Sequence, residues 1–250
     1  PLTTLMLSNI RKIIVISSPR DNERFRGLLN DGSNLGLEID YLVQEQPDGI
    51  ASSFIIAENY IKNRNSALIL GDNFFYGENF SKKLQNCRKL KSGAKVFLHP
   101  VGNPKLYGVA TINKKNKIVK IIEKPKKTKS NLAVTGLYFF DNNVIKLSKS
   151  LSPSKRKEIE IVDLLNKYRK KNKLSAEFIG RGGAWLETGN IKNFYQTSAF
   201  VEAIENRQGL KIACLEEIAL DNNWIGKKQI MEAVKFYGKC DYSNYLLKLI

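Results

Sequence analysis

A single carboxylate, Asp72, follows the short apolar run that opens the segment LILGDNFFYG at residues 68–77. With Ala67 before it, the run ALIL at 67–70 is ended by a glycine and predicts a buried strand, and in α/β sheets ligands bind beyond the carboxyl ends of the strands. A carboxylate at that edge is placed to hold a cation or to accept hydrogen bonds from a ligand. An Asp after a strand also often caps the next turn, so this residue alone is compatible with both roles.

Apolar runs rich in β-branched or aromatic residues predict the strands that would position this carboxylate. They span residues 13–17, 38–43, 67–70, 95–101, 136–140 and 176–179, and a hairpin is predicted at 109–112 and 117–122. Helical patterns lie between them at 48–64, 78–90 and 157–171. This alternation predicts an α/β, Rossmann-like fold: a mixed, mostly parallel sheet flanked by helices, with an inserted hairpin.

Residues 191–250 are predicted to be almost wholly helical, with helices at 191–207, 211–221, 227–238 and 242–249. We therefore expect an α/β domain over residues 1–190 and a helical C-terminal extension over 191–250. The extension carries more apolar side chains than so small an appendage can bury alone: Phe200, Val201, Ile204, Leu215, Ile218, Ile230, Val234, Leu246 and Leu249. It is expected to pack on the sheet domain and on another subunit.

The composition, with 42% hydrophobic and 26% charged residues, is typical of a soluble globular protein. No apolar stretch approaches the roughly 18 residues that a membrane-spanning helix needs. The three cysteines, Cys87, Cys214 and Cys240, are odd in number and far apart, which indicates reduced thiols in a cytoplasmic protein. The only histidine, His99, cannot build a histidine metal cluster.

The formal net charge of +17 would also suit a nucleic-acid-binding protein. The lysines concentrate at residues 114–129, 155–157 and 167–173, on predicted turns, loops and the polar face of a helix. No aromatic residues alternate with them to form a stacking platform, and no nucleic-acid-binding motif occurs. We interpret these lysines as solvated and expect no nucleic-acid partner.

The order of six motifs resembles that of the sugar-nucleotide pyrophosphorylases, and within them the glucose-1-phosphate thymidylyltransferases. The motifs are QEQPDGIASSF (44–54), LILGDNFFYG (68–77), PKLYGVA (104–110), IIEKPKKTKSNLAVTGLYFFD (121–141), EIEIVDL (158–164) and GRGGAWLETGN (180–190). The helical tail at 207–225 is similar as well. The resemblance implies a nucleotidyltransferase fold and transfer of a thymidylyl group from dTTP to glucose 1-phosphate, which gives dTDP-glucose and pyrophosphate for dTDP-rhamnose-type synthesis.

The resemblance also implies a Mg²⁺ ion held by two carboxylates. Asp72 of GDN would be one ligand, and Glu187 of WLETG would be the other, at a position where the family has Asp. Glu keeps the charge but moves it outward by about 1.5 Å, and Mg²⁺ tolerates poor geometry badly. Asp72, Lys124 and Arg156 are the implied catalytic residues.

For the nucleotide, the resemblance assigns Gln44 to the thymine edge and Pro47, Asp48 and Gly49 to the floor of the pocket, with Asp72 beside the phosphates. Asp48 could equally be the N-cap of the following helix. Gly49 has no side chain, which would let a ligand approach the backbone closely.

For the sugar phosphate, the resemblance assigns eight residues: Tyr107, Gly108, Glu123, Lys124, Val134, Thr135, Gly136 and Arg156. Glu123 would accept hydrogen bonds from sugar hydroxyls. Lys124 would meet the phosphate as a point charge and Arg156 as a forked donor. Lys124 could instead be one more solvated lysine, and Trp185 could simply belong to the core.

The family's strand and G-G-x-G-T-R-L loop, which cradle the triphosphate, do not occur in this sequence, nor does the lysine of its K-x-x-x-P segment. We therefore expect an N-terminal truncation. The absent strand should leave a buried gap or an unpaired edge in the sheet, and residues 1–250 alone should show little transfer.

Two alternatives remain open: a non-catalytic relative that binds nucleotide sugars or partner subunits, and a pyrophosphorylase for another nucleotide or sugar. The resemblance further implies a homotetramer.

Overall fold

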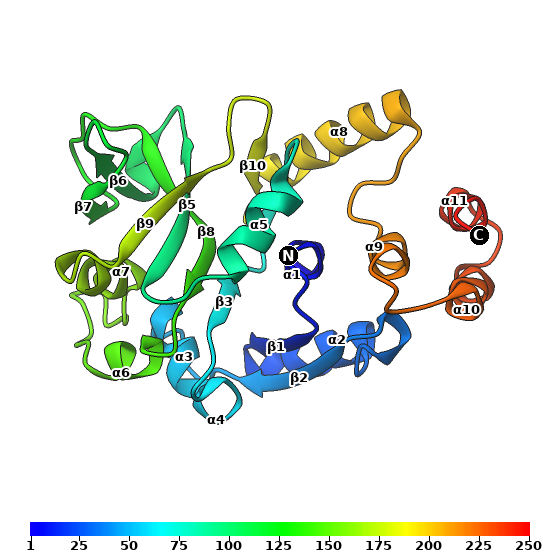
Figure 1. Ribbon diagram of the computed structural model, residues 1–250, viewed down its shortest axis with the longest axis horizontal. Coiled ribbons are helices and arrows are strands. Elements are labelled where there is room, and N and C mark those ends of the chain that lie inside the picture. Colours follow the sequence, from blue (N-terminus) through cyan, green and yellow to red (C-terminus); the bar gives the residue numbers. More distant parts are fainter.

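The computed structural model describes residues 1–250, and its centre is a six-stranded mixed sheet (Figure 1). The strand order is β7-β6-β8-β5-β9, with β3 also paired to β8. The strands are β3 (Ser66–Ile69), β5 (Ala94–Pro100), β6 (Gly108–Ile112), β7 (Ile118–Glu123), β8 (Leu132–Phe140) and β9 (Leu174–Phe178). β8 is antiparallel to β3, β5 and β6, and β9 is parallel to β5, so β3, β5, β6 and β9 share one direction.

The inner strands are buried on both faces, as expected for a sheet covered by helices on each side. Val96, Tyr138 and Phe140 point into a core that also contains residues of α3 (Ser53–Ile56), α6 (Val144–Lys149) and α7 (Ile161–Lys170). Their strand neighbours Phe97 and Phe139 point to the other face, where α5 (Phe80–Arg88) packs. Side chains of successive strand residues alternate between the faces, so one strand supplies both cores.

Two different strands, β6 and β3, pair with successive parts of one edge of β8, and we call the gap between them the split. Near its start, Ala133 of β8 pairs with β6, whereas further along, Leu137–Phe140 of β8 pair with β3. Between these two pairings, the Gly136 carbonyl accepts a hydrogen bond from the backbone N–H of Leu70, and the Gly136 N–H donates to Oδ1 of Asn73. The segment after β3 therefore enters the sheet at this split.

Two further strands, β4 (Asn73–Tyr76) and β10 (Ala184–Glu187), form a separate antiparallel ladder beside the split. Neither strand is among those that the sequence pattern predicts. α8 (Ile191–Gln208) follows β10 directly and lies along the same end of the molecule (Figure 1).

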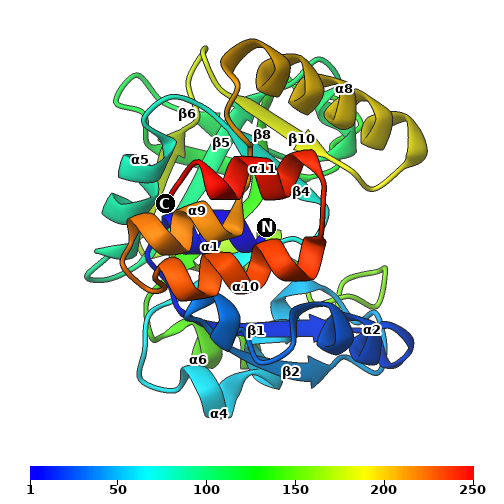
Figure 2. The same ribbon diagram turned by 90° about the vertical axis from the view of Figure 1, so that its right-hand side faces the viewer.

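The first and last parts of the chain share one hydrophobic core. β1 (Lys12–Ser17) and β2 (Glu38–Val43) form a parallel pair, preceded by α1 (Leu2–Leu7) and joined by α2 (Pro19–Leu29). α9 (Leu215–Asp221) packs against α1, and α10 (Lys227–Tyr237) and α11 (Asp241–Leu247) lie further out, on the side that faces the viewer in Figure 2. We call the shared core the terminal cluster; its buried members are Met6, Ile13, Leu35, Leu37, Ile39, Cys214, Ala219, Ile225, Ile230, Tyr245 and Leu246.

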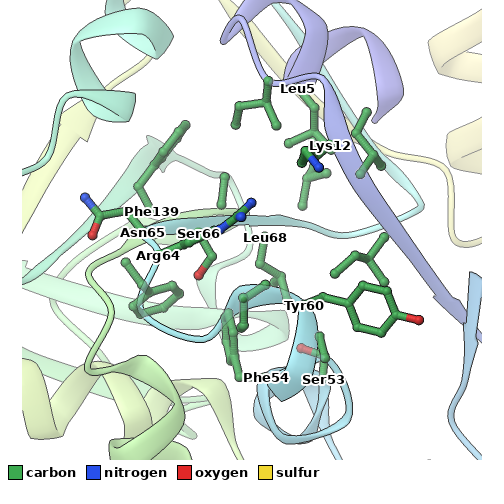
Figure 3. Close-up of a pocket in the computed structure, with 18 of the residues that line it drawn as sticks. Leu5, Lys12, Ser53, Phe54, Tyr60, Arg64, Asn65, Ser66, Leu68 and Phe139 are labelled. Atoms are coloured by element: carbon green, nitrogen blue, oxygen red, sulfur yellow. The ribbon is translucent and has the colours of Figure 1, made fainter. Parts of the chain in front are cut away.

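A cavity of about 820 Å³ separates the β1–β2 pair from the six-stranded sheet (Figure 3). Apolar residues of β1, such as Ile14, line one side, and residues of β3, such as Leu68, line the other. β1 pairs with β2 alone and β3 pairs with β8 alone, so each strand has an unpaired edge. The sequence predicted a buried gap or an unpaired edge in the sheet, and the fold contains both.

Several predicted elements are confirmed with small shifts, including β1, β2, the β6–β7 hairpin, α5 and α8. The predicted helix over residues 48–64 is instead a 3₁₀ turn at Ile50–Ser52 followed by α3 and the short α4 (Glu58–Ile61). The sequence pattern gave no signal for α2 or α6. None of the helices has the length and apolarity to cross a membrane.

Candidate active site

The β4–β10 ladder brings Asp72 and Glu187 to the ends of neighbouring strands. Glu187 pairs with Asn73, the residue after Asp72. The backbone N–H of Thr188 donates to the carbonyl oxygen of Asp72 at 2.7 Å. A Cβ atom added at Gly189 would lie 3.0 Å from Asp72 Oδ2, so the Asp72 carboxylate points toward the end of β10.

Each of the two carboxylates uses one oxygen in hydrogen bonds and leaves the other without a protein donor. Asp72 Oδ1 accepts from Asn73 Nδ2 at 2.6 Å. Glu187 Oε1 accepts from the Tyr107 hydroxyl at 3.0 Å and from Asn193 Nδ2 at 3.2 Å. Asp72 Oδ2 and Glu187 Oε2 remain available to a ligand. Both carboxylates are half-buried, and a carboxylate oxygen without a protein donor is the type of ligand that a hard divalent cation prefers.

Tyr107 and Trp185 form an aromatic wall next to Glu187. Their ring centroids lie 5.1 Å apart in an edge-to-face arrangement. Burial, together with the hydrogen bond to Glu187, raises the pKa of Tyr107 to about 12, so its hydroxyl remains a donor at neutral pH. Trp185 is buried in the core on the α5 face of the sheet, as one of the two interpretations of the sequence expected.

The acidic and basic side chains assigned to the sugar phosphate cluster beside a cleft of about 400 Å³ that Glu123, Arg156 and Glu160 help to line. Arg156 donates through Nε at 3.0 Å and through a terminal nitrogen at 2.7 Å to the two oxygens of Glu160. The same terminal nitrogen lies 3.5 Å from Glu123. The fork of Arg156 is thus already paired within the protein, which the sequence interpretation did not foresee.

Lys124 is different, because it is exposed and makes no ion pair. Its backbone has the positive φ of +39°, which non-glycine residues rarely adopt. Its N–H donates to the Tyr107 carbonyl at 3.0 Å. Burial, and then the nearby Glu160 carboxylate, raise the pKa of the neighbouring Glu123.

The three residues of β8 that were assigned to the pocket wall lie in the interior of the protein. Val134 is buried in the core, and Thr135 is fully buried, where its hydroxyl donates to the Phe97 carbonyl at 3.1 Å. The side chains of Val134 and Thr135 therefore do not line the cleft, because β8 is covered on both faces. Gly136 contacts Asn73, and a Cβ atom there would lie 2.6 Å from Asn73 Oδ1. Gly108 lies beside Glu123, since a Cβ atom there would be 3.2 Å from Glu123 Oε2.

The Gln44–Gly49 loop is held by its own side chains. The amide of Gln44 donates to Asp48 and, at 2.8 Å, to the Ser52 hydroxyl. Burial would raise the pKa of Asp48, but hydrogen bonds from Ser52 and Gln44 outweigh it and hold that pKa below its usual value. Asp48 does not cap a helix, since Gly49 occupies the position before the 3₁₀ turn and no side chain caps it. Pro47 is exposed at the tip of the loop.

The backbone conformation and a close neighbour both require a glycine at position 49. Gly49 has a φ of +106°, and a Cβ atom there would lie 2.5 Å from the carbonyl oxygen of Ile159. The Ile159 backbone therefore approaches Gly49 closely. Asp48 and Ile159 are further joined by a backbone hydrogen bond of 2.6 Å. This contact links the loop to the segment that carries Arg156 and Glu160.

Sequence reasoning missed Asn73, Glu160 and Asn193 as parts of the site. Glu160 could have been found, because it lies four residues after Arg156, a spacing at which opposite charges pair on a helical turn. Asn73 follows Asp72 directly, but its role depends on Gly136 and Trp185, which are distant in sequence. The arrangement as a whole offers two free carboxylate oxygens for a cation and a free ammonium for an anion.

A model of the nucleotidyl transferase family matches residues 1–204 of the chain. Among curated relatives, the glucose-1-phosphate thymidylyltransferase of Neisseria meningitidis serogroup A is 46% identical over 250 residues, which cover all of this chain and 87% of the relative. The enzyme of the same name from Mycobacterium tuberculosis is 41% identical over 250 residues, again all of this chain and 86% of the relative.

Solved structures agree with these sequence matches. A Bacillus anthracis protein provisionally named a glucose-1-phosphate thymidylyltransferase, crystallised in complex with sucrose, is 33% identical with a TM-score of 0.73. The match covers 80% of this chain and 79% of that chain. A UDP-glucose pyrophosphorylase in complex with UDP-glucose, at 18% identity and a TM-score of 0.67, shares the fold over 81% of this chain and 86% of its own.

Proposed function

Because the chain belongs to the nucleotidyl transferase family, we propose that it transfers a thymidylyl group from dTTP to glucose 1-phosphate. The products are dTDP-glucose and pyrophosphate, which feed nucleotide-sugar synthesis of the dTDP-rhamnose type. The observation that carries this proposal is the 46% identity to a glucose-1-phosphate thymidylyltransferase along the whole of this chain. The alternative of a non-catalytic relative is not favoured, because both carboxylates of the site are present.

In this reaction a phosphate oxygen of glucose 1-phosphate attacks the α-phosphorus of dTTP, and the bond to pyrophosphate breaks. Both reactants are anions, so the protein must mainly align them and offset their charge. Asp72 and Glu187 would hold Mg²⁺, which supplies positive charge to the phosphate oxygens when bound. The free oxygens of these two residues support this assignment. Mn²⁺ is a useful spectroscopic substitute for Mg²⁺ in testing it.

On the sugar side, Lys124 is the residue whose charge is free to meet the phosphate of glucose 1-phosphate. Its neighbour Glu123 accepts hydrogen bonds from the sugar hydroxyls, with Tyr107 and Gly108 along the ring. Nε and one terminal nitrogen of Arg156 are held by Glu160, so a two-pronged contact with the phosphate through these atoms requires Glu160 to release them. Arg156 therefore binds the phosphate with these atoms after it replaces hydrogen bonds to Glu160 by hydrogen bonds to the phosphate. Lys124 binds the phosphate without breaking an ion pair.

On the nucleotide side, Gln44 reads the thymine edge, with Pro47, Asp48 and Gly49 forming the floor. The hydrogen bonds from Gln44 to Asp48 and Ser52 fix the amide and leave its oxygen as the group that faces the base. The unpaired edges of β1 and β3 support an additional strand between them, and with it a cradle for the triphosphate.

Residues 1–190 carry the catalytic unit, and residues 191–250 form the packing and oligomer contacts of a homotetramer. The extension supports this because Ile191, Phe194 and Tyr195 of α8 are all exposed, as is Phe236 of α10. Light scattering of Phe194→Lys should show a smaller particle than the native protein. Gln196→Lys, which adds the same charge on the same helix, is the matched control and should leave the particle size unchanged.

The three cysteines are unpaired, which suits the reducing cytoplasm as the site of action.

Pyrophosphate release from dTTP and glucose 1-phosphate tests the proposed reaction, with calorimetric binding of glucose 1-phosphate and dTDP-glucose alongside it. The G-G-x-G-T-R-L loop does not occur in the sequence, so we expect binding of both ligands and slow turnover. Turnover at an ordinary enzyme rate would show that the loop is dispensable. Failure to bind either ligand would refute the proposal. Preference for another triphosphate or sugar phosphate in a panel would change the substrate but not the reaction.

A further inference from the structure

The side chain of Asn73 makes three hydrogen bonds next to the Asp72 carboxylate. It is 3% exposed and begins β4. Its Oδ1 accepts from the backbone N–H of Gly136 at 3.0 Å and from Nε1 of Trp185 at 2.6 Å. Its Nδ2 donates to Asp72 Oδ1 at 2.6 Å. One side chain therefore joins β8, β10 and the loop that carries Asp72.

We propose that Asn73 is a positioning residue that fixes the Asp72 carboxylate for cation binding, an inference that rests on the proposed function. Its amide holds one oxygen of Asp72 in place, so the other oxygen is the one presented to a ligand. Partners that orient a ligating carboxylate in this way influence affinity nearly as strongly as the ligands do. Asn73 touches neither substrate nor cation in this arrangement and acts through Asp72.

The amide is the chemical group that the position requires. One end must accept two hydrogen bonds and the other must donate one, which an asparagine side chain can do and an aspartate cannot. Gly136 fits the same requirement, because a Cβ atom there would lie 2.6 Å from Oδ1 and 2.8 Å from Cγ of Asn73. The absence of a side chain at position 136 of β8 thus leaves the space that the Asn73 amide occupies.

The Asn73 amide is also connected to the second carboxylate, Glu187, through two intervening side chains. Trp185, which donates to Asn73, packs against the ring of Tyr107, and Tyr107 donates to Glu187. Contacts therefore run without a break from Asp72 through Asn73, Trp185 and Tyr107 to Glu187. A change at Asn73 is expected to disturb both carboxylates, and the one it contacts directly should be affected more.

The test compares Asn73→Asp with Asn22→Asp in the full 250-residue chain. The first change replaces the donor to Asp72 by an acceptor of the same size. Asn22 is a matched control, because it is 5% exposed and donates to Ser17 and to the Leu42 carbonyl, away from the carboxylates. Mn²⁺ affinity is measured by electron paramagnetic resonance. The indole N–H resonances of Trp185 and Trp224 are recorded by nuclear magnetic resonance, and folding is followed by circular dichroism.

We expect Asn73→Asp to weaken Mn²⁺ binding by about 10- to 100-fold and to shift the Trp185 resonance, while the Trp224 resonance stays in place. Asn22→Asp should leave Mn²⁺ affinity and both resonances unchanged, even if it lowers stability. Unchanged Mn²⁺ affinity in a folded Asn73→Asp protein would overturn the positioning role, as would an equal loss in Asn22→Asp. A native chain that binds no Mn²⁺ would overturn it too.

If Asn73→Asp does not fold, Gly136→Ala provides the second route to the same answer. The added methyl group displaces the Asn73 amide without altering Asp72 itself. Weaker Mn²⁺ binding with a shifted Trp185 resonance supports the role, and native affinity overturns it. The transfer and ligand-binding assays judge the proposed function separately, because they address the substrates and not the orientation of one carboxylate.

Discussion

The six-stranded sheet and the β1–β2 pair face the same cavity but are held in place by different means. The sheet has a hydrophobic core on each face, and the carboxylates at its edge are fixed by named hydrogen bonds. The β1–β2 pair has an unpaired edge toward the cavity and packs instead against the C-terminal helices. The sheet therefore depends on strand pairing and packing on both faces, whereas the β1–β2 pair depends on its contacts with the C-terminal helices.

Asp72→Asn should produce the largest effect on cation binding, since it removes the charge of a proposed ligand at the edge of the sheet. Loss of a partner that only orients a ligand costs about 10- to 100-fold, so loss of the ligand itself should weaken Mn²⁺ binding by about 100-fold or more. Electron paramagnetic resonance titration measures this affinity, and pyrophosphate release should fall in parallel. Asp221→Asn, an exposed change on α9, is the control. Near-native affinity in Asp72→Asn would mean that the cation binds elsewhere.

A pair of leucine substitutions in the six-stranded sheet compares the packing of the wall that faces the cavity with that of the sheet core. Leu98→Ala, at a fully buried position in β5, should lower the free energy of unfolding by about 2–5 kcal/mol. Leu68→Ala, at the half-buried cavity wall of β3, should cost only about 1–2 kcal/mol, because less apolar surface is buried there. Urea unfolding of both variants gives the two values. Equal losses would show that the cavity wall is packed as tightly as the sheet core.

Asp141 makes the stability of the sheet depend on pH. Burial would raise its pKa, but hydrogen bonds from Gly93, Tyr168 and Asn143 outweigh it and lower the pKa below 3.8. The stabilisation is therefore present at neutral pH and is lost as the pH falls through the lowered value. Asp141→Asn should reduce the free energy of unfolding by about 1–3 kcal/mol at pH 7. The gap to the native protein should close below pH 3.8 in urea titrations, and a gap independent of pH would exclude this origin.

Tyr107→Phe should give the smallest effect of the series. It removes one of two donors to Glu187 Oε1 and leaves Asn193 in place. We expect Mn²⁺ affinity to fall by about 10-fold, the lower end of the range for partners of a ligand. Tyr195→Phe, at an exposed position of α8, serves as the control in the same titration. A loss as large as that of Asp72→Asn would place Tyr107 among the direct ligands.

The parts of the fold that the sequence predicted are those with a local signal. β1, β2 and the β6–β7 hairpin have runs of β-branched residues, and α8 has a long helical pattern. β4 and β10 have only four residues each and pair across more than 100 positions of sequence, which no local pattern can indicate. The strands that carry the site were thus the ones least visible in the sequence.

The candidate site was predictable in its residue types but not in its contacts. The motifs indicated Asp72, Glu187 and Lys124, and the structure brings the two carboxylates to neighbouring strands. The motifs could not show that Glu160 occupies the fork of Arg156 or that β8 buries Thr135. Both depend on which faces are covered in the folded protein.

The terminal cluster has a consequence for synthesis on the ribosome. Met6 and Ile13 near the start of the chain share a core with Tyr245 and Leu246 near its end. At about 5–20 residues per second, the ribosome would need roughly 10–50 seconds after Ile13 to make these partners. During that interval the apolar face of β1 and β2 has no cover, so a nascent or prematurely ended chain would depend on chaperones to avoid aggregation.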